Sequence, residues 1–250
     1  METFNPFSLK GKSILVTGAS SGIGRETAII CSKMGAQILV TGRNEERLRL
    51  TLNKLEGDGH MSLSVDLDET DQVNNLVKQC SLLDGIVHCA GIGDRTLLRN
   101  VQEKDIERVM NTNFNGPVLL QRMLLKAKKV KAKASIVFIA SRAPFAPTIG
   151  NGLYSASKGA LIAYSKVLGL ELASKLIRVN CICPAMVWTE LIERDASLLG
   201  IDYHEEEKTY PLKRYGKSED IANLVVYLLS DASSWMTGSC IDITGGANSL

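Results

Sequence analysis

The chain has 250 residues, of which 45% are hydrophobic and 22% are charged, so it contains enough apolar material for a well-buried core. Its 29 basic and 27 acidic residues leave a net charge of +2, and we therefore expect neither nucleic acid nor an anionic membrane as a partner. No apolar run reaches the roughly 20 residues of a membrane-spanning helix, and the amino terminus lacks the pattern of a signal peptide, so we expect a cytoplasmic protein.

Short apolar segments alternate with amphipathic ones along the chain, and the short segments are nearly continuously apolar. That is typical of a parallel sheet covered by helices on both faces. The expected strands are Ser13–Thr17, Gln37–Thr41, Ser62–Asp66, Gly85–Cys89, Ser135–Ala140, Ile177–Cys183 and Ser239–Ile243. The expected helices are Ile23–Met34, Glu45–Leu55, Glu69–Cys80, Gln102–Lys126, Tyr154–Ala173 and Ser218–Leu229. This alternation predicts an α/β fold, a Rossmann-type doubly wound sheet of about seven parallel strands in one domain, residues 1–250.

Two long connections, Gly91–Val101 and Ala185–Lys217, follow the carboxyl ends of predicted strands. Ligands bind at these ends in open α/β sheets, and long loops in compact domains are usually functional or mobile. We expect both to wall a substrate pocket, the second as a lid. The alternative is that they are variable surface loops.

A glycine-rich turn with the sequence TGASSGIG follows the first predicted strand and begins the first predicted helix. Its glycines would allow a tight turn and bring backbone N–H groups close to a pyrophosphate at the helix N-terminus. A glycine pattern alone could mark an ordinary turn, but its place between strand and helix predicts a dinucleotide site. The expected cofactor contacts here are Gly18, Ser20, Ser21, Gly22, Ile23 and Gly24.

The second predicted strand is followed by Gly42, Arg43 and Asn44. An acidic residue at this point would accept both ribose hydroxyls of NAD and repel the 2′-phosphate of NADP. The Arg43 guanidinium can bind that phosphate instead, so NADP(H) is expected in preference to NAD(H), which stays open as an alternative. Arg43 could also be an exposed residue of the charged cluster that begins the next helix.

Six cysteines are scattered through apolar segments without a C-x-x-C motif. Buried, reduced thiols are expected rather than a metal or redox site, and reduced thiols suit the cytosol. Cys181 and Cys183 alternate within a predicted strand and should therefore share one face of the sheet.

Tyr154 and Lys158 are four residues apart in a predicted helix, so their side chains should lie on one face. An isolated tyrosine has a pKa of about 10, and an ammonium about 4 Å away could lower it by up to roughly three units. The pair therefore predicts proton transfer near neutral pH, which beside a dinucleotide indicates hydride transfer to or from a carbonyl carbon. Alternatively, both side chains could extend over a core helix without a chemical role.

Taken together, these motifs resemble the short-chain dehydrogenase/reductase family, in particular the subgroup that includes the 3-oxoacyl-acyl-carrier-protein reductases. The resemblance covers nearly the whole chain, and its specificity comes from the ordered set of motifs. The residues that carry it are TGASSGIG at Thr17–Gly24, Asp66-Leu67, Ala90-Gly91, Asn113, Ser141, Tyr154-x3-Lys158, and Thr189 after Pro184.

The resemblance implies that Tyr154 is the proton donor in carbonyl reduction and that Ser141 binds the carbonyl oxygen. Lys158 would lower the pKa of Tyr154 and hold the nicotinamide ribose, while Asn113 would anchor a water on the proton path. Of the other implied cofactor contacts, Asp66 would meet the adenine with Leu67 beside it, Ala90 and Gly91 would line the nicotinamide ribose, and Val187 and Thr189 would face the carboxamide. Cys89 and Pro184 are further expected cofactor contacts.

The chain departs from the family pattern at four positions. Where the family commonly shows Asn-Asn-Ala-Gly, this chain has His88-Cys89-Ala90-Gly91, and it also differs at Ala185 and Ser21. His88 stands in place of an asparagine that ties neighbouring strands together, and it could do the same through a ring nitrogen or could simply pack. Ala185 replaces a glycine, and a positive φ there would cost about 1 kcal/mol. Ser21 stands where many NADP-dependent members carry a basic residue, so phosphate recognition would depend mostly on Arg43.

The expected substrate is a small-molecule or carrier-bound carbonyl compound. A basic run from Lys126 to Lys133 precedes the fifth predicted strand, and Lys175 follows the next helix; in the carrier-protein reductases, basic residues in these regions bind the acidic carrier. Both could equally be solvated helix ends. Because Gly152–Leu172 is apolar around much of its circumference and family members are commonly tetramers, we expect a homotetramer or a homodimer.

Three functions therefore stay open from the sequence alone. The first is an NADPH-dependent carbonyl reductase, possibly acting on 3-oxoacyl carriers. The second is an NAD-dependent alcohol, sugar or steroid-like dehydrogenase. The third is a regulatory protein that binds the cofactor without turnover, which the presence of all four catalytic-type residues disfavours.

Overall fold

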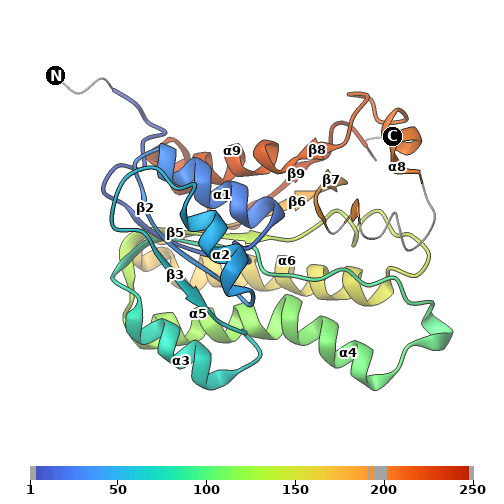
Figure 1. Cartoon of the computed structure of the whole chain (residues 1–250), viewed down its shortest axis with the longest axis horizontal. Helices are drawn as coiled ribbons and strands as arrows, with labels where there is room; N and C mark the ends of the chain where they lie inside the picture. Colours follow the sequence, from blue (N-terminus) through green and yellow to red (C-terminus); the bar gives the residue numbers. More distant parts are fainter. Residues whose placement is uncertain (1–3, 191, 194–201, 248–250) are drawn as a thin grey trace.

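The computed structural model describes residues 4–190, 192–193 and 202–247 (Figure 1). As the sequence predicted, seven parallel strands form one sheet, and their order is β3-β2-β1-β4-β5-β6-β9. Their bounds are β1 Ser13–Thr17, β2 Gln37–Gly42, β3 Met61–Ser64, β4 Leu83–His88, β5 Val130–Ile139, β6 Arg178–Pro184 and β9 Cys240–Ile243. The reversal of strand order between β1 and β4 opens a crevice at their carboxyl ends, where doubly wound sheets bind ligands.

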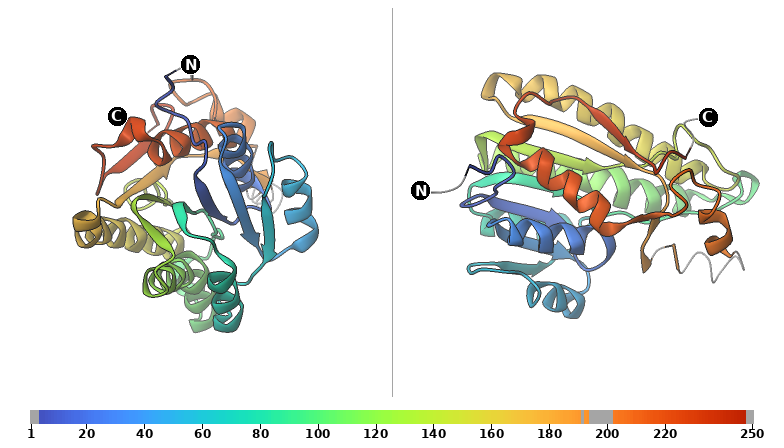
Figure 2. Two further views of the ribbon diagram at one scale, coloured as in Figure 1. Left: turned by 90° about the vertical axis from the view of Figure 1, so that its left-hand side faces the viewer. Right: turned by 90° about the horizontal axis from the view of Figure 1, so that it is seen from above.

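Helices cover both faces of the sheet, as Figure 2 shows. The bounds are α1 Gly22–Lys33, α2 Glu45–Leu52, α3 Thr70–Gln79, α4 Glu103–Met110, α5 Gly116–Lys126, α6 Gly152–Leu172, α8 Tyr203–Glu207 and α9 Ser218–Leu229. Alternate strand residues enter two separate cores: Leu15 packs towards α3, α5 and α6, whereas Ile14 and Val16 pack towards α1 and α9. This two-sided burial explains why the strands read as continuously apolar.

The predicted helix Gln102–Lys126 is interrupted. Between α4 and α5 lies a π-helical turn, Asn111–Asn115, and Pro117 follows at the start of α5. Pro117 has no N–H, so it cannot donate the α-helical hydrogen bond to the carbonyl of Asn113, four residues earlier. The interruption therefore has a local cause in the sequence, and such turns are frequent at functional sites.

The predicted loop Ala185–Lys217 contains regular structure. A small two-stranded sheet joins β7, Val187–Trp188, to β8, Gly216–Lys217, and α8 lies between them in the chain. Part of the segment expected to form a lid, residues 191 and 194–201, lies outside the described residues.

Strand β5 begins five residues earlier than predicted, so the basic run is partly inside the sheet. Lys131 pairs with Asp84 at 2.8 Å, and Lys129 donates to the carbonyl oxygen of Cys80 at 2.6 Å, near the end of α3. The register shifts between Leu83 and Gly85, which explains why apolar periodicity did not reveal the start of β5. These lysines therefore stabilise the amino-terminal edge of the sheet, opposite the carboxyl ends of the strands.

None of the helices in the described part of the chain is both long and apolar enough to cross a membrane.

Candidate active site

A cavity of about 1160 Å³ opens at the carboxyl ends of β1, β2, β4, β5 and β6. Of the residues that the sequence singled out as catalytic or cofactor-binding, all line this cavity except Asn113, which is fully buried behind its wall. The structure thus brings together the glycine turn, the segment after β4, the Tyr154 helix and the segment after β6, which lie far apart in the sequence.

The glycine turn fits closely against its neighbours. Gly18 has a φ of +65°, and a Cβ there would lie 2.7 Å from the backbone nitrogen of Ala90. Gly22 has a φ of +50°, and its Cβ would lie 3.2 Å from the Thr189 side chain. Only glycine satisfies both the left-handed conformation and this close approach. The turn leaves the N-terminus of α1 beside the cavity, an arrangement that suits a pyrophosphate.

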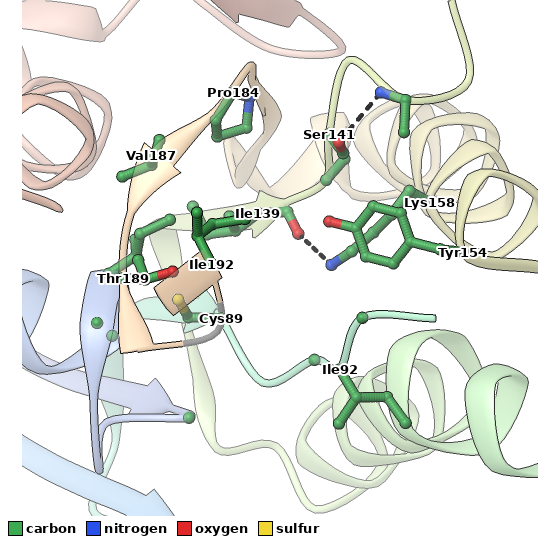
Figure 3. Close-up of a pocket in the computed structure, with 18 of the residues that line it drawn as sticks. Cys89, Ile92, Ile139, Ser141, Tyr154, Lys158, Pro184, Val187, Thr189 and Ile192 are labelled. Atoms are coloured by element: carbon green, nitrogen blue, oxygen red, sulfur yellow. Dashed lines mark hydrogen bonds between the residues drawn. The ribbon is translucent and has the colours of Figure 1, made fainter. Parts of the chain in front are cut away.

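Lys158 and Tyr154 project from the first turns of α6 towards the end of β5 (Figure 3). The Lys158 ammonium lies 5.7 Å from the centroid of the Tyr154 ring and donates to the carbonyl oxygen of Ile139 at 2.9 Å. Lys158 is buried, and the Tyr154 hydroxyl points towards the strand end that carries Ser141 (Figure 3). The Ser141 hydroxyl accepts a hydrogen bond from the backbone N–H of Ala143 at 3.1 Å, which leaves its own proton free to donate.

Asn113 holds the segment after β4 in place. Its Oδ1 accepts from the N–H of Ile92 at 2.8 Å, and its Nδ2 donates to the carbonyl of Ile92 and to Ser157 Oγ, both at 3.0 Å. Ser157 Oγ donates in turn to the carbonyl of Tyr154 at 2.8 Å. Gly91 makes this approach possible, because a Cβ there would lie 3.2 Å from both Asn113 Oδ1 and Lys158 Nζ.

The end of β2 carries the residues expected to recognise the adenosine half of a dinucleotide. Arg43 lines the cavity, whereas Asn44 caps helix α2 by accepting from the N–H of Arg47 at 2.9 Å. The Asn44 side chain is therefore engaged in the fold as well as exposed to the cavity. At the end of β3, the Asp66 carboxylate accepts from the N–H of Asp68 at 3.2 Å and lines the same end of the cavity.

The departures from the family pattern at His88 and Ala185 have structural explanations. His88 donates from Nε2 to Gln121 Oε1 at 3.0 Å and stacks on Phe138, so it both forms a hydrogen bond and packs. Burial lowers the pKa of His88 to about 4, which keeps the imidazole neutral. Ala185 does not take a positive φ, so its Cβ causes no backbone strain.

The cysteine prediction holds in part: Cys31, Cys80, Cys181 and Cys183 are free and buried, whereas Cys89 and Cys240 are free and only partly buried. Cys181 and Cys183 share the core on the α6 side of the sheet. Burial raises the pKa of the Cys89 thiol to about 12, so this cavity residue stays protonated and is unsuited to act as a nucleophile.

The sequence did not single out several residues that shape the site. Thr17 Oγ1 accepts from the N–H groups of Cys89 and Ala90, at 3.1 and 3.2 Å, and so joins the ends of β1 and β4. Ser157 could have been noticed, because it lies one helical turn from Tyr154. The ion pairs that Glu190 makes with Arg25 and Arg47 join three separate segments, and no local pattern indicated them.

A protein-family model described as enoyl-(acyl carrier protein) reductase matches residues 18–248. Among curated proteins, a 3-oxoacyl-[acyl-carrier-protein] reductase FabG of Rickettsia conorii is 32% identical over 241 residues, which cover 95% of this chain and 97% of that protein. One from Thermotoga maritima is 32% identical over 250 residues, covering 95% and 98%.

Solved structures agree with this similarity. A short-chain type dehydrogenase/reductase from Mycobacterium marinum has a TM-score of 0.88 at 31% identity, covering 98% of each chain. A structure described as a short-chain dehydrogenase/reductase, glucose/ribitol dehydrogenase, from Brucella melitensis has a TM-score of 0.89 at 29% identity, covering 97% of this chain and 98% of that one.

Proposed function

Because this chain belongs to the short-chain dehydrogenase/reductase family and is therefore an NAD(P)-dependent oxidoreductase, we propose that it uses NADPH to reduce a ketone or 3-oxoacyl carbonyl to a secondary alcohol. One observation carries the proposal. Ser141, Tyr154 and Lys158 line the same cavity as the glycine turn, so the proposed proton donor and the proposed dinucleotide site lie in one cavity. We propose that residues 1–250 act as a single catalytic domain.

The glycine turn supports the binding of a nicotinamide cofactor, because Gly18 and Gly22 let it pack closely against Ala90 and Thr189 while the turn lines the cavity at the start of α1. The backbone N–H groups at the start of α1 would hold the pyrophosphate, and Arg43 would hold the 2′-phosphate. Lys158 would bind the nicotinamide ribose. The cofactor, when bound, supplies the hydride, while the protein supplies position and a proton.

In the proposed mechanism, Tyr154 donates its hydroxyl proton to the carbonyl oxygen of the substrate. Ser141 would hold that oxygen through a hydrogen bond, since its own hydroxyl already accepts from Ala143 and is free to donate. The buried ammonium of Lys158 would stabilise the negative charge left on the tyrosine oxygen.

Asn113 would return the proton from solvent by holding a water. Its side-chain amide is fully engaged with Ile92 and Ser157, so we propose that the water binds its backbone carbonyl. That carbonyl lacks the α-helical bond that Pro117 cannot donate. The π-helical turn would then serve the proton path.

The 3-oxoacyl carrier substrate is supported by the names of the similar reductases. Docking of an acidic carrier through the predicted basic run has less support within one subunit, because Lys129 and Lys131 are bonded at the opposite edge of the sheet.

We propose association of subunits through α5 and α6, where Leu119, Val167 and Leu170 are exposed. The free cysteines support a reducing, cytoplasmic location.

The test is a substrate panel with both reduced nicotinamides, followed by the loss of absorbance of the reduced cofactor. We expect NADPH oxidation with a ketone or a 3-oxoacyl thioester. Turnover only with NADH and a sugar or alcohol partner would favour the dehydrogenase alternative, and turnover only with a 2-enoyl thioester would contradict carbonyl reduction. No turnover with any partner, although both nucleotides bind, would favour a regulatory role.

Arg43→Ala tests the proposed cofactor preference. If Arg43 binds the 2′-phosphate, the variant should bind NADPH at least tenfold more weakly and NADH unchanged, as fluorescence titration would measure. An equal loss of affinity for NADPH and for NADH would contradict the role assigned to Arg43.

A further inference from the structure

A charged cluster closes the part of the cavity beside α1 and α2. Glu190, on the segment that follows β7, forms ion pairs with Arg47 of α2 and with Arg25 of α1, and Glu190 and Arg47 both line the cavity. Arg25 Nη1 lies 3.7 Å from Glu190 Oε1. The Glu190 side chain is 48% exposed, so the carboxylate can be displaced by a competing anion without unfolding of the core.

This cluster lies beside the end of β2. Arg25 donates from Nη2 to the carbonyl oxygen of Ser20 and from Nε to Thr51 Oγ1 at 3.3 Å, which fixes its guanidinium against the glycine turn. The Ser20 hydroxyl oxygen lies 3.4 Å from the position of a Cβ on Gly42, the last residue of β2. In doubly wound sheets the end of the second strand faces the ribose that carries the 2′-phosphate in NADP. The guanidinium groups therefore lie next to the place of that phosphate.

The two guanidinium groups share one counter-ion, the Glu190 carboxylate. Burial and the charge of Arg47 lower the pKa of Arg25, which shows that the two cations are close enough to repel each other. Glu190 supplies the negative charge from a segment 143 positions after Arg47 and 165 positions after Arg25 in the chain. The Glu190 carboxylate therefore lies near the position at which NAD-dependent enzymes carry an acidic residue, the end of the second strand.

We propose that Glu190 sets the cofactor preference of the enzyme by competing with the 2′-phosphate of NADP for Arg25 and Arg47. The proposal rests on the proposed nucleotide site. NADPH must displace the carboxylate to bring its phosphate between the guanidinium groups, whereas NADH has no such phosphate and leaves the ion pairs intact. Removing the negative charge should therefore strengthen NADPH binding and leave NADH binding unchanged.

The experiment is a fluorescence titration of NADPH and NADH into the wild-type protein and into Glu190→Gln. We expect the Kd for NADPH to fall about fivefold, the size of a favourable exposed charge–charge interaction, and the Kd for NADH to stay within about twofold. Glu193→Gln is the matched control, because Glu193 lies in the same helical turn and is exposed but makes no ion pair with any described residue. It should change neither Kd.

Arg47→Gln is the complementary variant, and it should weaken NADPH about fivefold while leaving NADH unchanged. Equal shifts of both Kd values in Glu190→Gln, or weaker NADPH binding, would show that Glu190 only fastens its segment to α1 and α2 and would overturn the proposal. Failure of the wild-type protein to bind either nucleotide would refute the proposed function itself. The two failures are distinguishable, because the first is seen only when the variant is compared with a wild type that binds.

Discussion

The burial of His88 predicts that the folded protein loses stability as the pH falls. Its imidazole lies in the core at the end of β4, stacked on Phe138 with ring centroids 4.6 Å apart and bonded to Gln121 at 3.0 Å. Burial lowers its pKa from the ordinary value of 6.5 to about 4. Nδ1 has no hydrogen-bond partner among the described residues, so nothing there would stabilise a second ring proton.

The sign and size of the effect follow from this shift. The unfolded chain takes up a proton on His88 as the pH falls below 6.5, but the folded protein does so only near pH 4, so acid favours unfolding across this window. At 1.36 kcal/mol for each pKa unit, the loss is about 2 kcal/mol at pH 5 and about 3 kcal/mol at pH 4. The loss levels off at about 3.4 kcal/mol below about pH 3, where His88 is protonated in both states.

The assay is urea unfolding of the wild-type protein and of His88→Asn at pH 7.5 and pH 5. The variant keeps a polar side chain at this position but does not titrate in this range. The difference in unfolding free energy between the two proteins should shift by about 2 kcal/mol in favour of the variant when the pH is lowered. A difference that is the same at both pH values would refute the reasoning, because it would mean that the burial of His88 does not keep it neutral.

Three further predictions concern the candidate active site. Tyr154→Phe should lower kcat by at least about 100-fold while the Kd for NADPH, measured by fluorescence, stays within twofold, and undiminished turnover would remove Tyr154 as the proton donor. Gly18→Ala should cost about 1–2 kcal/mol, because alanine is strained in the left-handed conformation and its Cβ would lie 2.7 Å from the Ala90 nitrogen. Nucleotide binding should therefore weaken at least tenfold, and an unchanged Kd in fluorescence titration would contradict the close fit. Asn113→Leu should lower the free energy of unfolding by about 2–4 kcal/mol, because the partly buried N–H and carbonyl of Ile92 and the buried Ser157 Oγ would lose their partner. An unaltered urea midpoint would disprove this anchoring role.

The sequence alone determined the architecture of the sheet and most of the site. Short, nearly continuously apolar strands and turn residues are local features, and the physical rules that connect parallel strands leave few topologies open. The place of Tyr154 and Lys158 on one helix face also followed directly from their spacing. Since ligands bind at the carboxyl ends of the strands, the motifs that follow several strands could be assigned to one cavity before any coordinates were known.

Contacts between segments that are distant in the chain were decided by the tertiary structure. The start of β5 is set by its pairing with β4 across a register shift, and pairing energy does not appear in the pattern of one strand. The engagement of Asn113 with Ile92, of His88 with Gln121 and of Glu190 with its two arginines likewise joins residues at least 21 positions apart. Hydrogen bonds and ion pairs depend on distance and direction in space, and polar residues with no periodic pattern carry no sign of their partners until the backbone has brought them together.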